Sequence, residues 1–479
     1  MGREDVQKRP IEEDEDRMIL GIEPGAVYGL EPEARRMLDE LLHTYQAHES
    51  ANRTKAKYYE GKIPLSEVNL GIALPHGMDG LEIGCAWGAK CVDVLAARSM
   101  FDGFVNESGE DIPELDSLVN GNRLITEYSK ATRDELKYGS TFATLSADPV
   151  IGCKIRFHSP RQAAARWDGE KGRIAYGFAI IDEAPDNEKK DWKPNLLNLY
   201  TDDAVWVLHR DGARWFAEYH PQKMGRPLME PMIWNATSDK PFGRSRIKEP
   251  IRRLIQGYVR TIANASIGLE FSTAPQKYLM GVSDDMYDTL VNDKFRQYVG
   301  SILAATTNPD NGEKPSFGQL PQGTISPHVE MLKILAAQFG AATGLSVTDT
   351  GVVNDSNPTS ADAITAATQT LVSTAEALNT GNGDALKTII LMAQAIAGGK
   401  TMEELEEEQT QIYAHFRNPS MPSIAQTSDA AVKIATARKS FAETDVFLEM
   451  LGFSPADIRR IKNQERRGQG LATLEEMGI

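Results

Sequence analysis

Three stretches with helical periodicity, at residues 247–270, 327–343 and 360–379, are separated by two long turn-rich segments. None of the three carries a group of residues that could perform chemistry. An enzyme of this length would usually show a nucleophile with its base, a metal cluster or a phosphate-binding loop. Long helices joined by turn-rich loops are typical of rings and channels. The sequence therefore predicts a structural part of an assembly.

The charge balance limits the partners of the chain. The 479 residues carry a formal net charge of −16, whereas a protein that holds nucleic acid by its phosphates is more often basic. The acidity argues against tight DNA binding, but not against DNA that passes close by. Apolar residues make up 41% of the chain, which is enough for large cores in about two to four domains.

The sequence also predicts where the chain resides. No run of eighteen apolar residues occurs, so no membrane span is expected. Residues 1–20 hold seven acids and four bases and are expected to form a flexible, solvated arm. Cys85, Cys91 and Cys153 match no zinc or redox spacing, so we expect buried, reduced thiols in a protein made in the cytoplasm.

The first third of the chain predicts helices at residues 33–58, at about 84–98 and at about 115–138. The first of these ends at Tyr58-Tyr59-Glu60-Gly61. Gly80, Gly84 and Gly88 are spaced four apart. This spacing favours a loosely packed helix start, and the alternative is a face that another backbone approaches closely.

Residues 141–220 change to a β pattern and predict an antiparallel sheet. Two apolar runs, 204–208 and 214–219, flank Asp211-Gly212. This pair predicts a hairpin turn with a positive φ at both turn positions.

The later helices carry start and stop signals. Ser326 is expected to cap a helix that has Pro327 in its first turn and ends at Gly344. A capping box at 359–362 starts the next helix, which we expect to pause at 380–383 and to resume up to about Ala397. Further helices are predicted at 428–440, 444–451 and from 454 to 467.

Residues 244–260 form the sharpest basic cluster, with six bases and one acid. The bases are Arg244, Arg246, Lys248, Arg252, Arg253 and Arg260. One interpretation is contact with DNA or a partner, and the favoured one is salt bridging to acidic neighbours in an assembly.

Candidate sites for chemistry are weak. Gly398-Gly399-Lys400-Thr401 lacks the earlier glycine and the preceding strand of a phosphate loop, so a glycine helix stop is favoured. The acid pairs Asp202-Asp203 and Asp284-Asp285 could hold a metal, but solvated turns are favoured. The sequence predicts no cofactor, no metal site and no enzymatic activity.

Several motifs, taken together, resemble the portal proteins of tailed double-stranded-DNA bacteriophages, in particular those of long-tailed phages. They are spread over most of the chain, and their order and spacing carry the resemblance. They are Tyr58-Tyr59-Glu60-Gly61, Trp87 with 92–98, Tyr138-Gly139-Ser140, Phe242-Gly243-Arg244-Ser245-Arg246-Ile247, and 425–430 with Lys433. Cys85 and Cys91 within the tryptophan motif and the sequence of 344–358 depart from the family pattern.

The resemblance implies an α+β, mainly helical fold of the portal type, with an α/β wing, a helical stem, a small clip, a tunnel loop and a helical crown. The implied divisions follow the chain. They are the arm 1–20, the wing 21–243, the first stem helix 244–271, the clip 272–323, the second stem helix 324–343, the tunnel loop 344–358, the long wing helix 359–425 and the crown 426–479.

The resemblance also implies a ring of about twelve subunits at one capsid vertex. Double-stranded DNA would pass the tunnel loop at Thr348, Asp349, Thr350, Asn354 and Asp355. The terminase large subunit and later the head–tail adaptor would dock on the clip, where Asp284, Asp285, Lys294 and Arg296 are candidates. Major capsid and scaffolding proteins are further expected partners. A phage-associated nuclease or minor capsid hydrolase is the alternative.

Overall fold

The computed structural model of the chain describes residues 20–63, 83–186, 191–273, 277–280, 314, 316–319, 324–352, 361–408, 411–420, 424–453, 457–465 and 467. The chain divides into two compact units. Unit 1 comprises Met1–Ala56, Cys91–Ile247 and Ile364–Ile479, and unit 2 comprises Lys57–Lys90 and Lys248–Ala363. Helices α1 (Pro32–Glu60) and α2 (Trp87–Ala96) contribute residues to both units.

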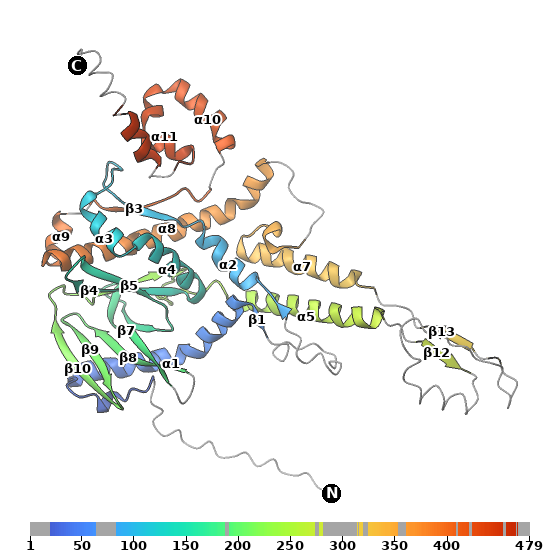
Figure 1. The fold of residues 1–479 in the computed structure, drawn as a ribbon, viewed down its shortest axis with the longest axis horizontal. Coiled ribbons are helices and arrows are strands. Elements are labelled where there is room, and N and C mark those ends of the chain that lie inside the picture. The colour runs from blue at the N-terminus through green and yellow to red at the C-terminus, as the bar shows by residue number, and fades with distance from the viewer. Residues whose placement is uncertain are drawn as a thin grey trace, which may run out of the picture. The chain divides into compact units, whose positions relative to one another are not determined.

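Unit 1 contains three antiparallel sheets, two of which include strands from the predicted region 141–220 (Figure 1). A five-stranded sheet has the order β10-β9-β8-β7-β6, formed by β6 (Ala163–Asp168), β7 (Arg173–Asp186), β8 (Asp191–Tyr200), β9 (Ala204–Asp211) and β10 (Arg214–Pro221). A three-stranded sheet has the order β11-β4-β5, formed by β4 (Ser140–Asp148), β5 (Gly152–His158) and β11 (Met229–Ile233). The third pairs β3 (Phe101–Val105) with β14 (Tyr413–Phe416).

The hairpin predicted at Asp211-Gly212 is present, but its turn differs from the prediction. Asp211 pairs with Arg214 in the β9–β10 ladder, so the two turn residues are Gly212 and Ala213. Gly212 has φ +62° and is the one residue of this turn with a positive φ. A single glycine at the first turn position is sufficient for a tight hairpin.

Helix α1 packs on the five-stranded sheet within unit 1. Its apolar stripe is buried against inward-facing strand residues, which alternate with half-buried ones along β9. The helix contributes Leu38, Leu41, Leu42 and Tyr45, and the strands contribute Phe178, Leu197, Leu199 and Leu208. Since a buried Leu or Phe side chain is worth about 1.5–3 kcal/mol, this stripe is a main tie between helix and sheet.

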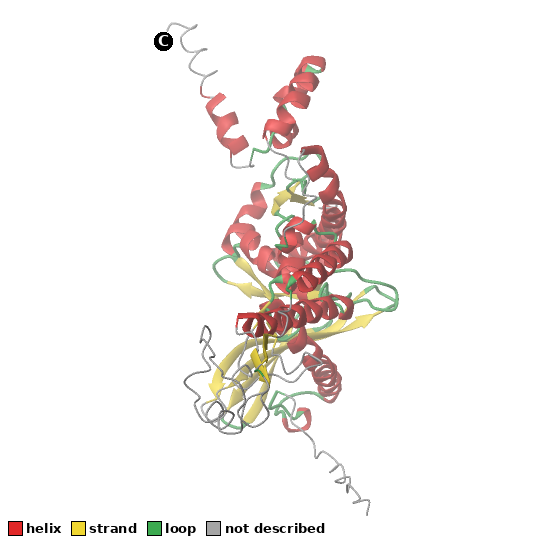
Figure 2. Cartoon of the chain, turned by 90° about the vertical axis from the view of Figure 1, so that its right-hand side faces the viewer, coloured by secondary structure: helices red, strands yellow, loops and turns green. Residues whose placement is uncertain are grey.

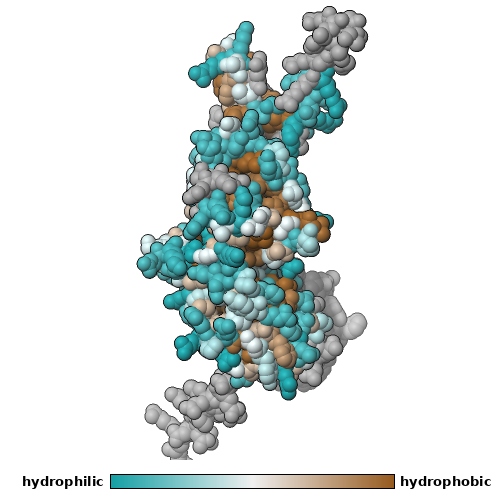
Figure 3. Space-filling model, turned by 90° about the vertical axis from the view of Figure 1, so that its left-hand side faces the viewer, coloured by the Kyte–Doolittle hydropathy of each residue, from teal (hydrophilic) through white to brown (hydrophobic). Residues whose placement is uncertain are grey.

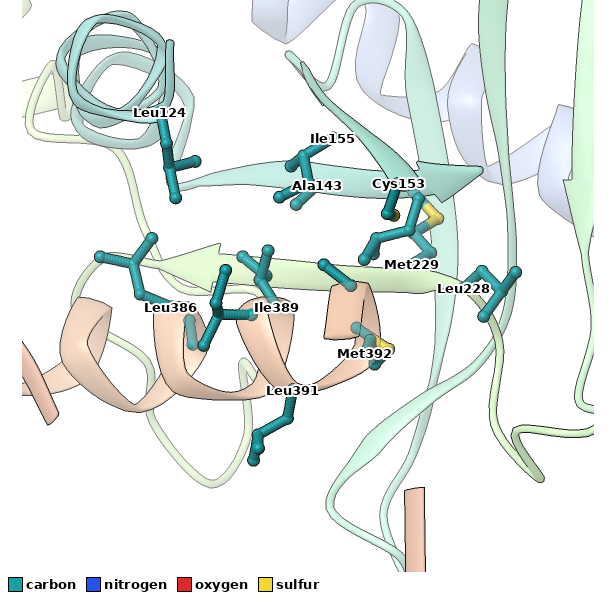
Figure 4. Packing of buried hydrophobic residues seen from close by; sticks show 14 of the residues in the cluster. Leu124, Ala143, Cys153, Ile155, Leu228, Met229, Leu386, Ile389, Leu391 and Met392 are labelled. Carbon is teal, nitrogen blue, oxygen red and sulfur yellow. The ribbon is translucent and has the colours of Figure 1, made fainter. Parts of the chain in front are cut away.

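A second core joins the three-stranded sheet to α4 (Leu124–Tyr138) and α8 (Ala361–Gly398). Figure 4 shows Leu386, Ile389 and Met392 of α8 beside strand residues Ala143 and Met229. The spacing of three between these α8 residues places them on one helical face.

Two helix predictions are wrong in detail. Helix α8 runs without a pause through 380–383, where Asn382 is fully buried and a Cβ on Gly383 would lie 3.6 Å from Phe416 Cε2. The predicted helix at 115–138 is split into α3 (Asp116–Gly121) and α4, because Arg123 adopts a left-handed φ of +51°. The buried Asn122 side chain binds the backbone of β5 at this break.

The remaining described elements of unit 1 are short. They are η1 (Pro24–Ala26), η3 (Pro113–Leu115), α9 (Met402–Glu408), α10 (Ile424–Ala437), η6 (Lys439–Glu443), α11 (Asp445–Met450) and helical residues 457–465. Figure 3 shows apolar patches interspersed with hydrophilic side chains on one face.

Unit 2 is built on two helices, α5 (Glu249–Thr273) and α7 (Ser326–Thr343), which lie side by side (Figure 1). The apolar stripe on α5 is buried at Ile251, Ile255 and Val259. Ser326 is the first helical residue of α7 rather than its cap, and Gly344 ends the helix with φ +73°. Strands β1 (Lys62–Ile63) and β2 (Ile83–Gly84) pair, as do β12 (Lys277–Met280) and β13 (Ser316–Gln319).

The fold is of the α+β class and mainly helical, as predicted, and Figure 2 shows both kinds of element. Among the described helices, none is long and apolar enough to cross a membrane. Unit 2 groups residues 57–90 with the two predicted stem helices, although the sequence prediction had placed those residues in the wing. The wing, stem, clip and crown boundaries stay predictions.

Candidate functional site

The segment that follows α7 is the described part of the predicted tunnel loop. It contains the short helix η5 (Val347–Thr350). The Asp349 carboxylate accepts hydrogen bonds from the Ser346 backbone N (3.1 Å) and Oγ (2.7 Å), and the Asp349 N donates to Ser346 Oγ (3.3 Å). This reciprocal pair is a capping box, so Asp349 has a structural role in the segment.

Trp87 anchors this segment within unit 2. Its Nε1 donates a hydrogen bond of 3.0 Å to the Thr350 backbone oxygen. Its ring stacks on Phe339 of α7, with centroids 4.7 Å apart, and tilts against Tyr258 of α5 at 4.8 Å. We call Trp87, Tyr258, Phe339 and Thr350 the Trp87 cluster. It connects α2, both long helices and η5 through one indole ring.

Two glycines allow the close packing around this cluster. A Cβ on Gly88 would lie 1.9 Å from the Tyr58 backbone oxygen, and one on Gly257 would lie 3.1 Å from Leu335 Cδ2. The close approach that the sequence left as the alternative therefore holds at Gly88. Gly84 has nothing within 4 Å, and Gly80 lies outside the described residues.

The predicted channel residues are only partly described. Thr350 is buried and bound to Trp87 through its backbone, and the Thr348 side chain, Asn354 and Asp355 lie outside the described part. Asp349 is described, and its replacement would remove the two hydrogen bonds that its carboxylate accepts from Ser346.

The predicted basic cluster divides between the two units. In unit 1, Arg244 pairs with Asp239 at 3.4 Å, and Arg246 donates from Nε to the Cys91 backbone oxygen at 2.5 Å. Burial lowers the pKa of the Arg246 guanidinium, whose role is thus inside the fold.

In unit 2, the other four bases lie on or beside α5. Arg253 pairs with Glu249 at 3.2 Å, and Arg252 lies over the Tyr58 ring at 6.0 Å. Lys248 and Arg260 are exposed. Contact of these bases with DNA or another subunit stays a prediction. The predicted clip residues Asp284, Asp285, Lys294 and Arg296 lie outside the described part.

A buried polar network in unit 1 was not predicted from the sequence. It is formed by Ser99, Tyr128, Glu135 and Asn382, and we call it the Glu135 network. Asn382 Nδ2 donates to Glu135 Oε2 (2.8 Å) and to the Tyr128 hydroxyl (3.0 Å), which lies 2.6 Å from Ser99 Oγ. Glu135 and Asn382 are fully buried. Burial raises the pKa of Glu135 to about 8. The sequence signal for this network is the presence of polar residues on otherwise apolar helix faces.

The described motifs that were weak candidates for chemistry form an ordinary turn and a helix end. Asp202 lies near Lys171 (3.5 Å) and Arg173 (3.9 Å) in a turn, and Gly399 ends α8 with φ +65°. The described residues contain no group of three or more His, Cys, Asp or Glu placed to hold a metal ion. All three cysteines are free and buried, as predicted, and burial raises their pKa values.

Comparison with known proteins bears on the resemblance. No protein-family model matches the chain. The portal protein of Mycobacterium phage D29 is 23% identical over 456 residues, covering 92% of this chain and 90% of that protein. The portal protein of Mycobacterium phage L5 is 22% identical with the same coverage. The chain is similar to phage portal proteins over most of its length. The resemblance predicted from the sequence is confirmed.

The similarity of the chain to solved structures is weaker. A chain in the virion of a native gene transfer agent (GTA) particle is 13% identical, with a TM-score of 0.44, covering 77% of this chain and 90% of that chain. A chain in the neck of an empty GTA particle, computed with C6 symmetry, is 12% identical with a TM-score of 0.43, covering 78% and 89%. These scores are too low to support an argument about fold or assembly.

Proposed function

We propose that this chain is the portal protein of a tailed phage. The observation that carries the proposal is the similarity to two phage portal proteins over 92% of the chain. In this role the chain forms a closed ring of about twelve subunits at one capsid vertex, and double-stranded DNA enters and leaves through it. The protein is then a virion component that is assembled in the host cytoplasm.

An exposed apolar face on α7 supports a ring. Leu335 and Phe339 are buried within unit 2, whereas Met331 and Ile334 on the adjacent face are 42% and 52% exposed. A helix whose apolar stripe is wider than its buried face usually buries the remainder against another partner. A neighbouring copy in the ring would cover the second face, because a ring closes through two different complementary surfaces.

The acidity of the chain supports passage of DNA rather than binding. Each copy carries −16, so a ring of these chains is strongly acidic. DNA carries one charge per ~1.7 Å of helix axis, and basic side chains along a channel would hold it. We propose that residues 344–358 line the channel with small polar residues and two acids, Asp349 and Asp355.

The proposed role as a portal protein also implies docking partners. The segment 272–323 would bind the terminase large subunit during packaging and the head–tail adaptor afterwards. Capsid and scaffolding proteins would surround the ring. We propose no intrinsic catalytic activity, since the related proteins are portal proteins. No observation favours the alternative of a nuclease or hydrolase.

Electron microscopy of the purified full-length protein tests this proposal. We expect closed rings with a central channel, and Ile334→Glu should break them because it places a charge in the apolar contact between copies. Val150→Glu is the matched control, since Val150 is 88% exposed in a turn. Particles without a channel at every protein and salt concentration would refute the proposed function.

A further inference from the structure

A basic cavity opens within unit 1. Its volume is about 570 Å³, and Arg123, Lys154 and Arg156 line it. None of these three side chains is hydrogen-bonded or ion-paired to another described residue. Glu127, which also lines the cavity, is already paired with Lys130 at 2.7 Å. Three cations without an ion pair among the described residues, in a chain of charge −16, indicate an anionic partner.

The free edge of β5 forms one wall of this cavity. β5 is the outer strand of its sheet, and the Asn122 side chain binds its Cys153 oxygen and Ile155 nitrogen, each at 2.9 Å. Antiparallel pairing alternates, so the Phe157 N–H also points away from β4, as does the Ile155 oxygen. Beyond Asn122, the edge therefore presents a backbone acceptor and donor to the cavity.

The free hydrogen-bonding groups of the β5 edge determine which class of anionic ligand fits the cavity. A phosphodiester of a nucleic acid can accept from the Phe157 N–H but has nothing to donate to the Ile155 oxygen, whereas a peptide backbone pairs with both. His158 adds no charge, because burial lowers its pKa to about 4 and its ring binds Thr144. The cavity thus combines peptide-pairing groups with cationic side chains.

We propose that the β5 edge and the cations Arg123, Lys154 and Arg156 dock the acidic segment Glu12–Asp16 of a second copy of this chain. This segment is the longest unbroken run of acids in the sequence, and it lies outside the described residues. The inference deepens the proposed ring, in which neighbouring copies must meet through two unlike surfaces. An acidic run and a basic strand edge are such a pair.

Isotope-mixed cross-linking tests the contact in the full-length assembly. Rings formed from mixed ¹⁴N and ¹⁵N chains are treated with a carbodiimide, which joins an amine to a carboxylate. We expect light–heavy peptide pairs that join Lys154 to the acidic run. Lys154→Arg keeps the charge but removes the amine, and should abolish the cross-link while rings persist. Absence of the cross-link, or pairs confined to one copy, would overturn the inference.

A binding measurement separates this inference from the proposed function, because it needs no ring. The probe is a labelled peptide of residues 9–19, added to full-length protein whose residues 12–16 are changed to Gln or Asn. Replacing Arg123, Lys154 and Arg156 by Gln should weaken binding at least about tenfold at low salt. Lys223→Gln, an exposed cation elsewhere in unit 1, should not change it.

The nature of the ligand is tested with the same protein. A short DNA duplex that binds the three cations more tightly than the peptide does would overturn the assignment of a peptide partner. Equal binding of the peptide with its acids replaced by amides would overturn it as well. If rings fail to form but the peptide binds as expected, only the proposed function fails.

Discussion

The Trp87 cluster in unit 2 and the Glu135 network in unit 1 fix buried helices by different means. The Trp87 cluster consists of stacked aromatic rings with one polar contact, the bond from Nε1 to the Thr350 oxygen. The Glu135 network places four polar side chains in a core, and two acceptors, Glu135 Oε1 and Asn382 Oδ1, have no partner.

The stability of the two regions therefore depends on different physical properties. The aromatic cluster depends on shape, because its stabilisation comes from close packing that a wrong volume destroys. The polar network depends on protonation, because a buried carboxyl without a cation is stable only when neutral. The proton retained by Glu135 gives one of its oxygens a hydrogen to donate.

The largest effect is expected from Gly88→Ala, which tests the shape dependence. The added Cβ would lie 1.9 Å from the Tyr58 backbone oxygen, so the backbone must move. We expect a loss of at least about 3 kcal/mol in the free energy of unfolding. Gly84→Ala, with nothing within 4 Å, is the control. Equal denaturation curves for the two variants would show that the packing is loose.

The next effect is expected from Asn382→Ala in the polar network. Loss of the amide leaves Glu135 and the Tyr128 hydroxyl without the hydrogen bonds that it donates, which costs about 2–3 kcal/mol. Asn379→Ala on the same helix is the control, since its Oδ1 has no partner. Chemical denaturation measures both, and an equal effect of the two changes would remove the network as a stabilising unit.

A pH series distinguishes the two regions. Burial raises the pKa of Glu135 from 4.5 to about 8, so the folded chain keeps a proton that the unfolded chain loses above about pH 4.5. The contribution of Glu135 to stability is therefore full below that pH and falls by roughly 1.4 kcal/mol per pH unit up to about pH 8. Glu135→Gln should remove this contribution from the slope of the denaturation midpoints against pH, whereas the contribution of Glu230, whose pKa burial also raises, should remain. An unchanged slope would mean that Glu135 is already ionised.

The smallest effect is expected from Trp87→Phe. The change keeps a ring between Phe339 and Tyr258 but removes the hydrogen bond to Thr350, at a cost of about 1–2 kcal/mol. Amides of 346–351 should exchange hydrogen faster. Trp215→Phe, which removes a similar bond to the Gly21 oxygen in unit 1, should leave that exchange unchanged. No change in either variant would show that Trp87 does not anchor the segment.

Hydrophobic periodicity predicted the parts of the fold in which one apolar face packs against one neighbouring element. The stripes on α1 and α5 and the β9–β10 hairpin follow from local spacing. The break at Arg123 and the unbroken course of α8 do not. Asn122 satisfies a strand edge, and Asn382 binds residues more than 240 positions away, so tertiary contacts overrode the local glycine and asparagine signals.

The candidate site was predicted less completely. The place of the loop after α7 follows from Gly344, which ends the helix with a left-handed φ. The anchor does not, because Trp87 and Thr350 are separated by 263 positions and meet only in the folded unit. The capping role of Asp349 was visible in Ser346-Val347-Thr348-Asp349, but the acid was interpreted as a channel charge.

Native mass spectrometry of the purified protein tests the central proposal most directly. One chain has a mass of 52.8 kDa, so a twelve-subunit ring would have a mass of about 634 kDa. We predict a species at this mass, or at the mass of a neighbouring ring size, that persists on dilution. A stable species of 52.8 kDa at every concentration and salt condition, with no ring-sized species, would contradict the account.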